Sequence, residues 1–225
     1  MYKGMIKSLV KKYFCFTLGL YFLSMGIVLI VRSALGTTPI SSVNYVLSLN
    51  TPLSLGSATF ALNMFLILGQ FWLIKGMATK KKVTEILLQI PFSFVFGLFI
   101  DVNMAITNGI TPPNYFASIL ILIVGCLIQA TGVVLEVKPN VVMMSAEGFV
   151  KYASDRYNKE FGSLKRWFDI TLVVLAILAS LVMAHTVQGV REGTVIAALF
   201  TGTIVTFISR HVLNRKNYQR IRARI

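Results

Sequence analysis

Two short segments, each beginning with a proline, are the most informative part of this chain: PISSVNYVLSL at residues 39–49 and PNVVMMSAEGFVKYAS at residues 139–154. Each is too short to cross a bilayer, because a helical crossing takes about 20 apolar residues. Each is followed shortly by a Gly-Ser pair and a long apolar run. Short, interrupted apolar segments at corresponding places in two halves of a chain are typical of transporter binding sites. The pair therefore predicts a class of membrane protein and the position of its site.

The composition of the 225 residues is that of an integral membrane protein. Apolar residues make up 56% and charged residues 13%, with a mean hydropathy of +0.74, whereas a soluble domain has about 25% charged residues. Six runs are long enough to cross a bilayer, at residues 13–31, 57–74, 83–106, 115–135, 168–184 and 193–209. We therefore expect an all-α, polytopic membrane protein with six transmembrane helices and two short re-entrant or broken helices.

The basic residues, which give a net charge of +14, indicate orientation in a membrane and not nucleic-acid binding. They cluster before the first long run, between the second and third, between the fourth and fifth, and in the tail; only Arg32 and Arg191 fall on the other side. By the positive-inside rule, both termini lie in the cytoplasm of a bacterium with the protein in its inner membrane. The rule also requires residues 39–49 to enter the membrane and return to the same side, because a full crossing would place the lysines after the second long run outside the cell. A helix lying flat on the membrane surface is the alternative.

The two halves repeat one order of elements: a long run, a short segment led by proline, Gly-Ser, and two more long runs. In each half, a Gly-Ser pair ends six residues before a polar residue, Asn63 or Asp169, and both are candidates for substrate binding. Because each half makes three crossings, the second half is inverted relative to the first. We expect two repeats, residues 1–110 and 111–225, arranged as a 3+3 inverted repeat.

Polar residues around the first proline are candidates for substrate binding. They place hydroxyl groups and an amide at the start of a short helix: Thr38, Ser41, Ser42 and Asn44. The free N–H groups of a helix start bind anionic groups, and two opposed half-helices would direct both positive ends at one ligand. The alternative is that these side chains cap the helix and satisfy its backbone.

The second segment supplies two candidates for substrate binding, Met144 and the carboxylate Glu147, among apolar residues. An ionisable group at membrane depth is costly and usually faces a cavity or a partner. Glu147 is therefore a candidate for binding a cationic group or for carrying a proton. The alternative is that Lys151, four residues on, neutralises it on the same helix face.

Three further charged residues are weaker candidates. Asp169 follows Lys165 by four residues, a spacing that favours an ordinary ion pair at the membrane interface over a binding role. Arg191 and Glu192 begin the last long run. They are candidates for gating or coupling, with capping of the helix as the alternative.

The sequence motifs of common enzymes are missing. The chain has no Walker A motif, no dinucleotide-binding glycine motif and no His-Glu-x-x-His. Its two histidines and two cysteines are far apart in the sequence. We therefore expect no catalytic activity, no metal site and no cofactor.

Several motifs resemble those of a known family. LGTTPISS at residues 35–42, the Glu-Gly at 147–148, the step G-x-x-K-x-x-F-D at 162–169 and GVREGT at 189–194 look like the bacterial YczE/YyaS/YitT-like membrane proteins, in a branch of unknown function. The similarity covers nearly the whole chain, and it implies a permease without an agreed substrate. This chain departs from the family at residues 145–146, where Ser-Ala replaces the usual Pro-Gly.

These observations predict a secondary transporter of a small polar or zwitterionic metabolite, with proton coupling as an option and the site between the two short segments. The alternative is a membrane-embedded accessory or scaffold protein without transport activity. The expected partners are the lipid bilayer and a small-molecule substrate, and not nucleic acid. A homo-oligomer is compatible with the sequence.

Overall fold

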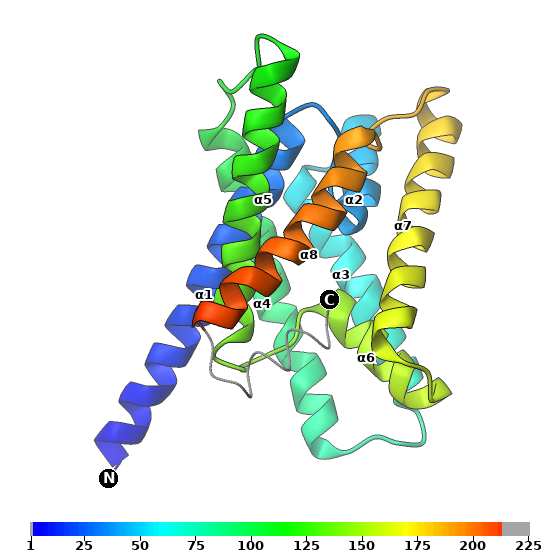
Figure 1. Cartoon of the computed structure of the whole chain (residues 1–225). Coiled ribbons are helices and arrows are strands. Elements are labelled where there is room, and N and C mark those ends of the chain that lie inside the picture. Colours follow the sequence, from blue (N-terminus) through cyan, green and yellow to red (C-terminus); the bar gives the residue numbers. More distant parts are fainter. Residues whose placement is uncertain (1, 213–225) are drawn as a thin grey trace.

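The computed structural model describes the backbone of residues 2–212 and the side chains of residues 9–209. Within that range the regular structure is entirely helical, without strands. The helices are α1 (Tyr2–Arg32), α2 (Pro39–Asn50), α3 (Leu55–Leu73), α4 (Lys80–Ile106), α5 (Tyr115–Val137), α6 (Ser145–Tyr157), α7 (Phe161–Ala184) and α8 (Glu192–Val212). Six of them are long and apolar enough to cross a membrane, and α2 and α6 are the two short ones. The prediction of an all-α, multi-pass membrane protein is therefore confirmed (Figure 1).

Three helices begin more than three residues away from the predicted start, and α1 is one of them, since it begins at Tyr2 and not at residue 13. The second short helix begins at Ser145 and not at Pro139, because Asn140 adopts a left-handed backbone (φ 52°) and residues 140–144 are not helical. The helix that contains the fifth long run begins at Phe161, seven residues before the predicted start at 168. Its first turns carry Lys165 and Arg166, so a search for apolar residues alone misses them.

The two short helices enter the bundle from opposite ends (Figure 1). At one end, Arg32 at the end of α1 donates to Met104 O at 2.8 Å, and Gly56 N at the start of α3 donates to Asp101 Oδ1 at 2.8 Å. The end of α1 and the start of α3 therefore both lie beside the end of α4, and the chain forms α2 between these two points. At the other end, Arg156 of α6 donates to the carbonyl oxygen of Leu73, at the end of α3, at 2.9 Å. The starts of both short helices are buried between these ends.

Glycines bring the backbones of α1 and α5 into direct contact. A Cβ atom on Gly26 would lie 2.4 Å from Gln129 N, and one on Gly132 would lie 2.3 Å from Leu23 N. Gly19 and Gly125 make similarly close approaches to the partner helix. Small residues at such positions let membrane helices pack closely, where van der Waals contact replaces the hydrophobic effect as the driving force.

The helices of the two halves interleave. α1 packs on α4 and α5, and α5 packs on α8. α2 packs on α3 and α7, while α6 packs on α3 and α7, and α3 packs on α4. This interleaving places the start of α2 and the start of α6 on either side of one central space.

Candidate functional site

A cavity of about 260 Å³ lies between the starts of α2 and α6, and all eight helices contribute to its wall. Seven of the eight predicted substrate-binding residues line it: Thr38, Ser41, Asn44, Asn63, Met144, Glu147 and Asp169. One water molecule needs only about 10–15 Å³ of such volume, so the cavity has room for a small solute. Residues that are far apart in the sequence therefore meet around one space of suitable size for a ligand.

Ser42, the eighth predicted residue, lies outside the cavity wall. Its hydroxyl is fully buried and donates to the carbonyl oxygen of Thr38 at 2.9 Å, and it lies 2.9 Å from the hydroxyl of Thr37. These bonds satisfy groups at the start of α2. Ser42 thus bonds to the backbone and to Thr37 at the start of α2, and it does not line the cavity.

The two predicted gating residues lie away from the cavity, at the end of the bundle where α8 begins. Arg191 Nη1 donates to Ala34 O at 3.1 Å, and its Nε lies 3.6 Å from Glu192 Oε2. The next residue, Gly193, donates its N–H to Leu35 O at 2.8 Å. The GVREGT motif (residues 189–194) therefore binds the start of α8 to the loop that precedes α2 through hydrogen bonds.

The starts of both short helices lack a capping side chain. Ser54, Thr79 and Asn114 cap α3, α4 and α5 by accepting a backbone N–H bond. No side chain does so at the starts of α2 and α6, where Thr38 and Met144 hold the N-cap positions. The start of α7 is also uncapped, but its first turn does not line the cavity. The N–H groups of a first turn have no partner within the helix, and they carry its positive end, so two positive helix ends lie at the cavity wall.

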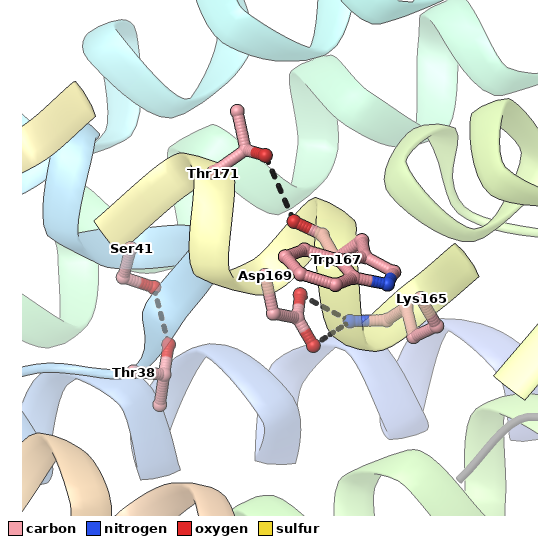
Figure 2. Close-up of polar contacts among 6 residues, drawn as sticks. All are labelled: Thr38, Ser41, Lys165, Trp167, Asp169 and Thr171. Atoms are coloured by element: carbon pink, nitrogen blue, oxygen red, sulfur yellow. Dashed lines mark hydrogen bonds and ion pairs between the residues drawn. The ribbon is translucent and has the colours of Figure 1, made fainter. Parts of the chain in front are cut away.

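The hydroxyl of Thr38 makes a local bond instead of capping the helix. It donates to Ser41 Oγ at 2.9 Å (Figure 2). Both residues line the cavity. The same view shows the Lys165–Asp169 ion pair on the neighbouring α7. The start of α2 and this ion pair therefore form one polar part of the wall.

Three buried amide side chains on the wall have hydrogen-bonding atoms without a partner: Asn44 Oδ1, Asn63 Nδ2 and Gln129 Oε1. Their relative exposures are 1%, 6% and 9%. The other polar atom of each asparagine amide is hydrogen-bonded. Asn44 Nδ2 donates to Thr59 Oγ1 at 3.2 Å, and Asn63 Oδ1 accepts from Ser145 Oγ at 2.5 Å. Buried polar atoms are almost always paired, so these exceptions mark a place where a polar ligand can bind.

Charged side chains give the cavity both signs of charge. Lys165 and Asp169 form the ion pair that their spacing predicts, but the pair lines the cavity and is not confined to the interface. Glu147 lies close enough to Asp169 for their charges to interact. Glu136, at the end of α5, is a fourth charged residue on the wall, and sequence reasoning missed it. An ammonium group, two helix ends and three carboxyl groups thus surround one space.

Side chains outside the cavity hold α6 in place. Gln70 and Gln89 exchange two hydrogen bonds of 2.8 and 2.9 Å, and Gln70 Nε2 also donates to the carbonyl oxygen of Ser145 at 3.0 Å. Further along α6, the phenol of Tyr152 lies 3.4 Å from Glu85 Oε2 and donates to it. Burial, and then the negative charge of Glu85, raise the pKa of Tyr152 to about 12, so the phenol keeps its proton at neutral pH. Sequence analysis did not identify either contact.

Among the described side chains, no three His, Cys, Asp or Glu residues gather as a metal site would require. Comparison with protein families matches residues 10–210 to a family of unknown function (DUF6198). The chain belongs to this family. No curated protein and no solved structure matches it. The family description names no activity.

Proposed function

We propose that this member of DUF6198 is a secondary transporter of a small polar or zwitterionic metabolite, with its binding site in the central cavity. The observation that carries the proposal is the meeting of two uncapped helix starts and an ion pair inside a bundle of membrane-spanning helices. Non-helical backbone at membrane depth is stable where protein buries it or a cavity is lined by it. Broken helices that point their positive ends at a ligand near the midplane are typical of secondary transporters.

The chemistry of the wall favours a ligand with both charges. An anionic group at the start of α2 would meet a positive helix end and the ammonium group of Lys165, which has three N–H donors. A cationic group would find the carboxyl groups of Glu147, Asp169 and Glu136. The unpaired amide atoms of Asn44 and Asn63 would bond the remaining polar atoms.

The proposal includes a 3+3 inverted repeat of residues 1–110 and 111–225, supported by the pattern of helix contacts. If α1, α2, α3 and α4 are exchanged for α5, α6, α7 and α8, the α1–α4 contact becomes α5–α8 and the α2–α3 contact becomes α6–α7. Likewise the α2–α7 contact becomes α6–α3. Rocking of one repeat against the other would open the cavity to each side of the membrane in turn. A relationship to the YczE/YyaS/YitT-like permeases would fit this plan.

The proposal also includes orientation and coupling. The end of the bundle that carries the lysines between α3 and α4 (Lys75, Lys80, Lys81 and Lys82) would face the cytoplasm of a bacterium, because basic loops stay on that side of the inner membrane. Glu147 would carry the coupled proton, because ionisable side chains at membrane depth mark ion and proton pathways and Glu147 lines the central cavity. Arg191 and Glu192 would act on gating only indirectly, through the loop that precedes α2.

The experiment has two steps. A panel of amino acids, amines and phosphorylated metabolites is first screened for thermal stabilisation of the purified protein, because a ligand of the native state raises its apparent stability. Uptake of the best ligand is then measured in proteoliposomes with and without a pH gradient. Glu147→Gln is expected to lower gradient-driven uptake by about tenfold or more, since loss of one partner of a buried charge contact costs several kcal/mol.

The matched control is Glu160→Gln, which makes the same chemical change on an exposed residue at the start of α7. It is expected to leave uptake unchanged. Normal uptake by Glu147→Gln with an unchanged pH profile would remove Glu147 as the proton carrier. A ligand that stabilises the protein but never crosses the membrane would favour the alternative, an accessory protein that binds without transporting.

A further inference from the structure

The α7–α8 pair departs from the proposed inverted repeat, in which it corresponds to the α3–α4 pair. In the first half, α3 and α4 touch through their backbones, and a Cβ atom on Gly56 would lie 2.1 Å from Gly97 O. Over their described lengths, α7 and α8 make no comparable contact. Gly162 stands in the second half where Gly56 stands in the first, and a Cβ atom there would meet only Glu160 Oε1, at 3.9 Å. A gap therefore remains between α7 and α8.

This gap is a groove of about 640 Å³ with apolar walls. Ile170, Val174 and Leu199 line it and are 51%, 47% and 67% exposed. Two threonines also line it, but Thr203 and Thr206 donate their hydroxyls to carbonyl oxygens of α8, each at 2.9 Å. The wall therefore presents hydrocarbon and methyl groups to whatever occupies the groove.

The groove and the central cavity adjoin and share part of their walls. The same four residues line both spaces: Pro39, Asp169, Ala198 and Gly202. The junction therefore lies at the start of α2 and beside the Lys165–Asp169 ion pair. Arg166 gives the groove wall a basic side chain at this place. A molecule that extends from the cavity into the groove would meet charges at one end and hydrocarbon at the other.

We infer that the substrate is an amphiphile, with a zwitterionic head group in the central cavity and a single alkyl chain in the groove between α7 and α8. This inference rests on the proposed transport function and narrows its substrate class. The head group pairs its anionic part with the start of α2 and Lys165, and its amine with Asp169 and Glu147. Because the groove opens beside the cavity, the substrate enters from the bilayer and its chain never crosses water.

The test compares two probes that share one head group. Lyso-phosphatidylethanolamine has a single alkyl chain, and glycerophosphoethanolamine has none. Binding of each radiolabelled probe is measured to the full chain in phosphatidylcholine nanodiscs. We expect saturable binding of the lysolipid at concentrations at least about tenfold below those at which glycerophosphoethanolamine binds, because the chain concentrates the probe in the membrane.

Two variants fill the groove from opposite walls, Ala198→Trp and Val174→Trp. Each is expected to weaken lysolipid binding by about tenfold, as overpacking of a filled space does, while Val174→Trp leaves glycerophosphoethanolamine binding unchanged. Val182→Trp is the control, because Val182 is 77% exposed on α7 and does not line the groove.

Two results would overturn the inference. Equal affinity for the two probes, with no effect of the groove variants on the lysolipid, would show that the groove holds no substrate chain. Such a result would leave transport of a small polar solute standing. Binding of neither probe would exclude the zwitterionic amphiphile as the substrate class. Uptake of water-soluble metabolites in the proteoliposome screen would still decide the transport function independently.

Discussion

At the scale of single residues, Asp101 shows how a charged side chain at the end of a membrane helix acts on structure. The sequence leaves two possibilities for it, a solvated helix end or part of a site. Its Oδ1 accepts from Gly56 N at 2.8 Å and its Oδ2 accepts from Ser54 Oγ at 2.7 Å. From α4, Asp101 thus accepts an N–H bond at the start of α3, in addition to the cap that Ser54 provides, and a negative charge is stabilising there.

We predict that Asp101→Ala lowers the free energy of unfolding by about 1–2 kcal/mol, the usual cost of removing a side chain that caps a helix. Ligand affinity should stay unchanged, because Asp101 does not line the central cavity. The measurements are chemical unfolding in mixed micelles and a ligand titration. Asp155→Ala, at an exposed position on α6, is the control. Unchanged stability together with weaker ligand binding would assign Asp101 to the site.

The polar residues of the cavity differ in how far the sequence could predict them. Thr38, Ser41 and Glu147 stand out because they lie in or next to segments too short to cross the bilayer. Polar groups at membrane depth are costly there unless they face a cavity or a partner. Gln129 and Glu136 lie within or at the end of a long apolar helix, and their spacing does not reveal which helix face meets the cavity. That face depends on how α5 packs against α1 and α8, which is a tertiary property.

At the scale of elements, the close contact of α1 with α5 fixes one wall of the cavity. We predict that Gly26→Ala destabilises the protein by about 1–3 kcal/mol, because the new methyl group would overlap backbone atoms of Gln129 that cannot move aside. Ligand affinity should fall too, since Gln129 lines the cavity. Gly109→Ala is the control, with nothing within 4 Å of the added Cβ atom. Equal thermal unfolding of the two variants would contradict this contact.

The two short helices show what proline can and cannot predict. Pro39 begins α2, because its fixed φ and missing N–H suit the first helical position. Pro139 instead follows Lys138, the C-cap residue of α5, and proline is common just after a helix end. The sequence allows both interpretations, and only the packing of α6 against α3 distinguishes them. The glycines of α1 and α5 were a usable signal, since Gly19 and Gly26 are seven residues apart, as are Gly125 and Gly132.

At the scale of the whole molecule, the basic residues predict which end of the bundle faces the cytoplasm. In a background with Cys15 and Cys126 replaced by alanine, a membrane-impermeant maleimide added outside intact cells should label Asn108→Cys and miss Lys80→Cys. The reason is that Lys80 begins α4 and Asn108 follows its end, so the two sites lie on opposite sides of the membrane. Labelling of both positions from outside would contradict the six-helix topology, whereas labelling of Lys80→Cys alone would reverse the orientation.

The central claim is that the cavity between α2 and α6 opens in turn to both sides of the membrane. The most direct measurement is the labelling of Ser41→Cys, in the same cysteine-free background, by an impermeant maleimide applied to right-side-out and to inside-out vesicles. Ser41 lines the cavity and is 4% exposed, so it reacts only when the cavity opens. We predict labelling from both sides, slowed by any ligand that stabilises the protein. Labelling from one side only, under every ligand and gradient condition, would contradict alternating access and with it the transport function.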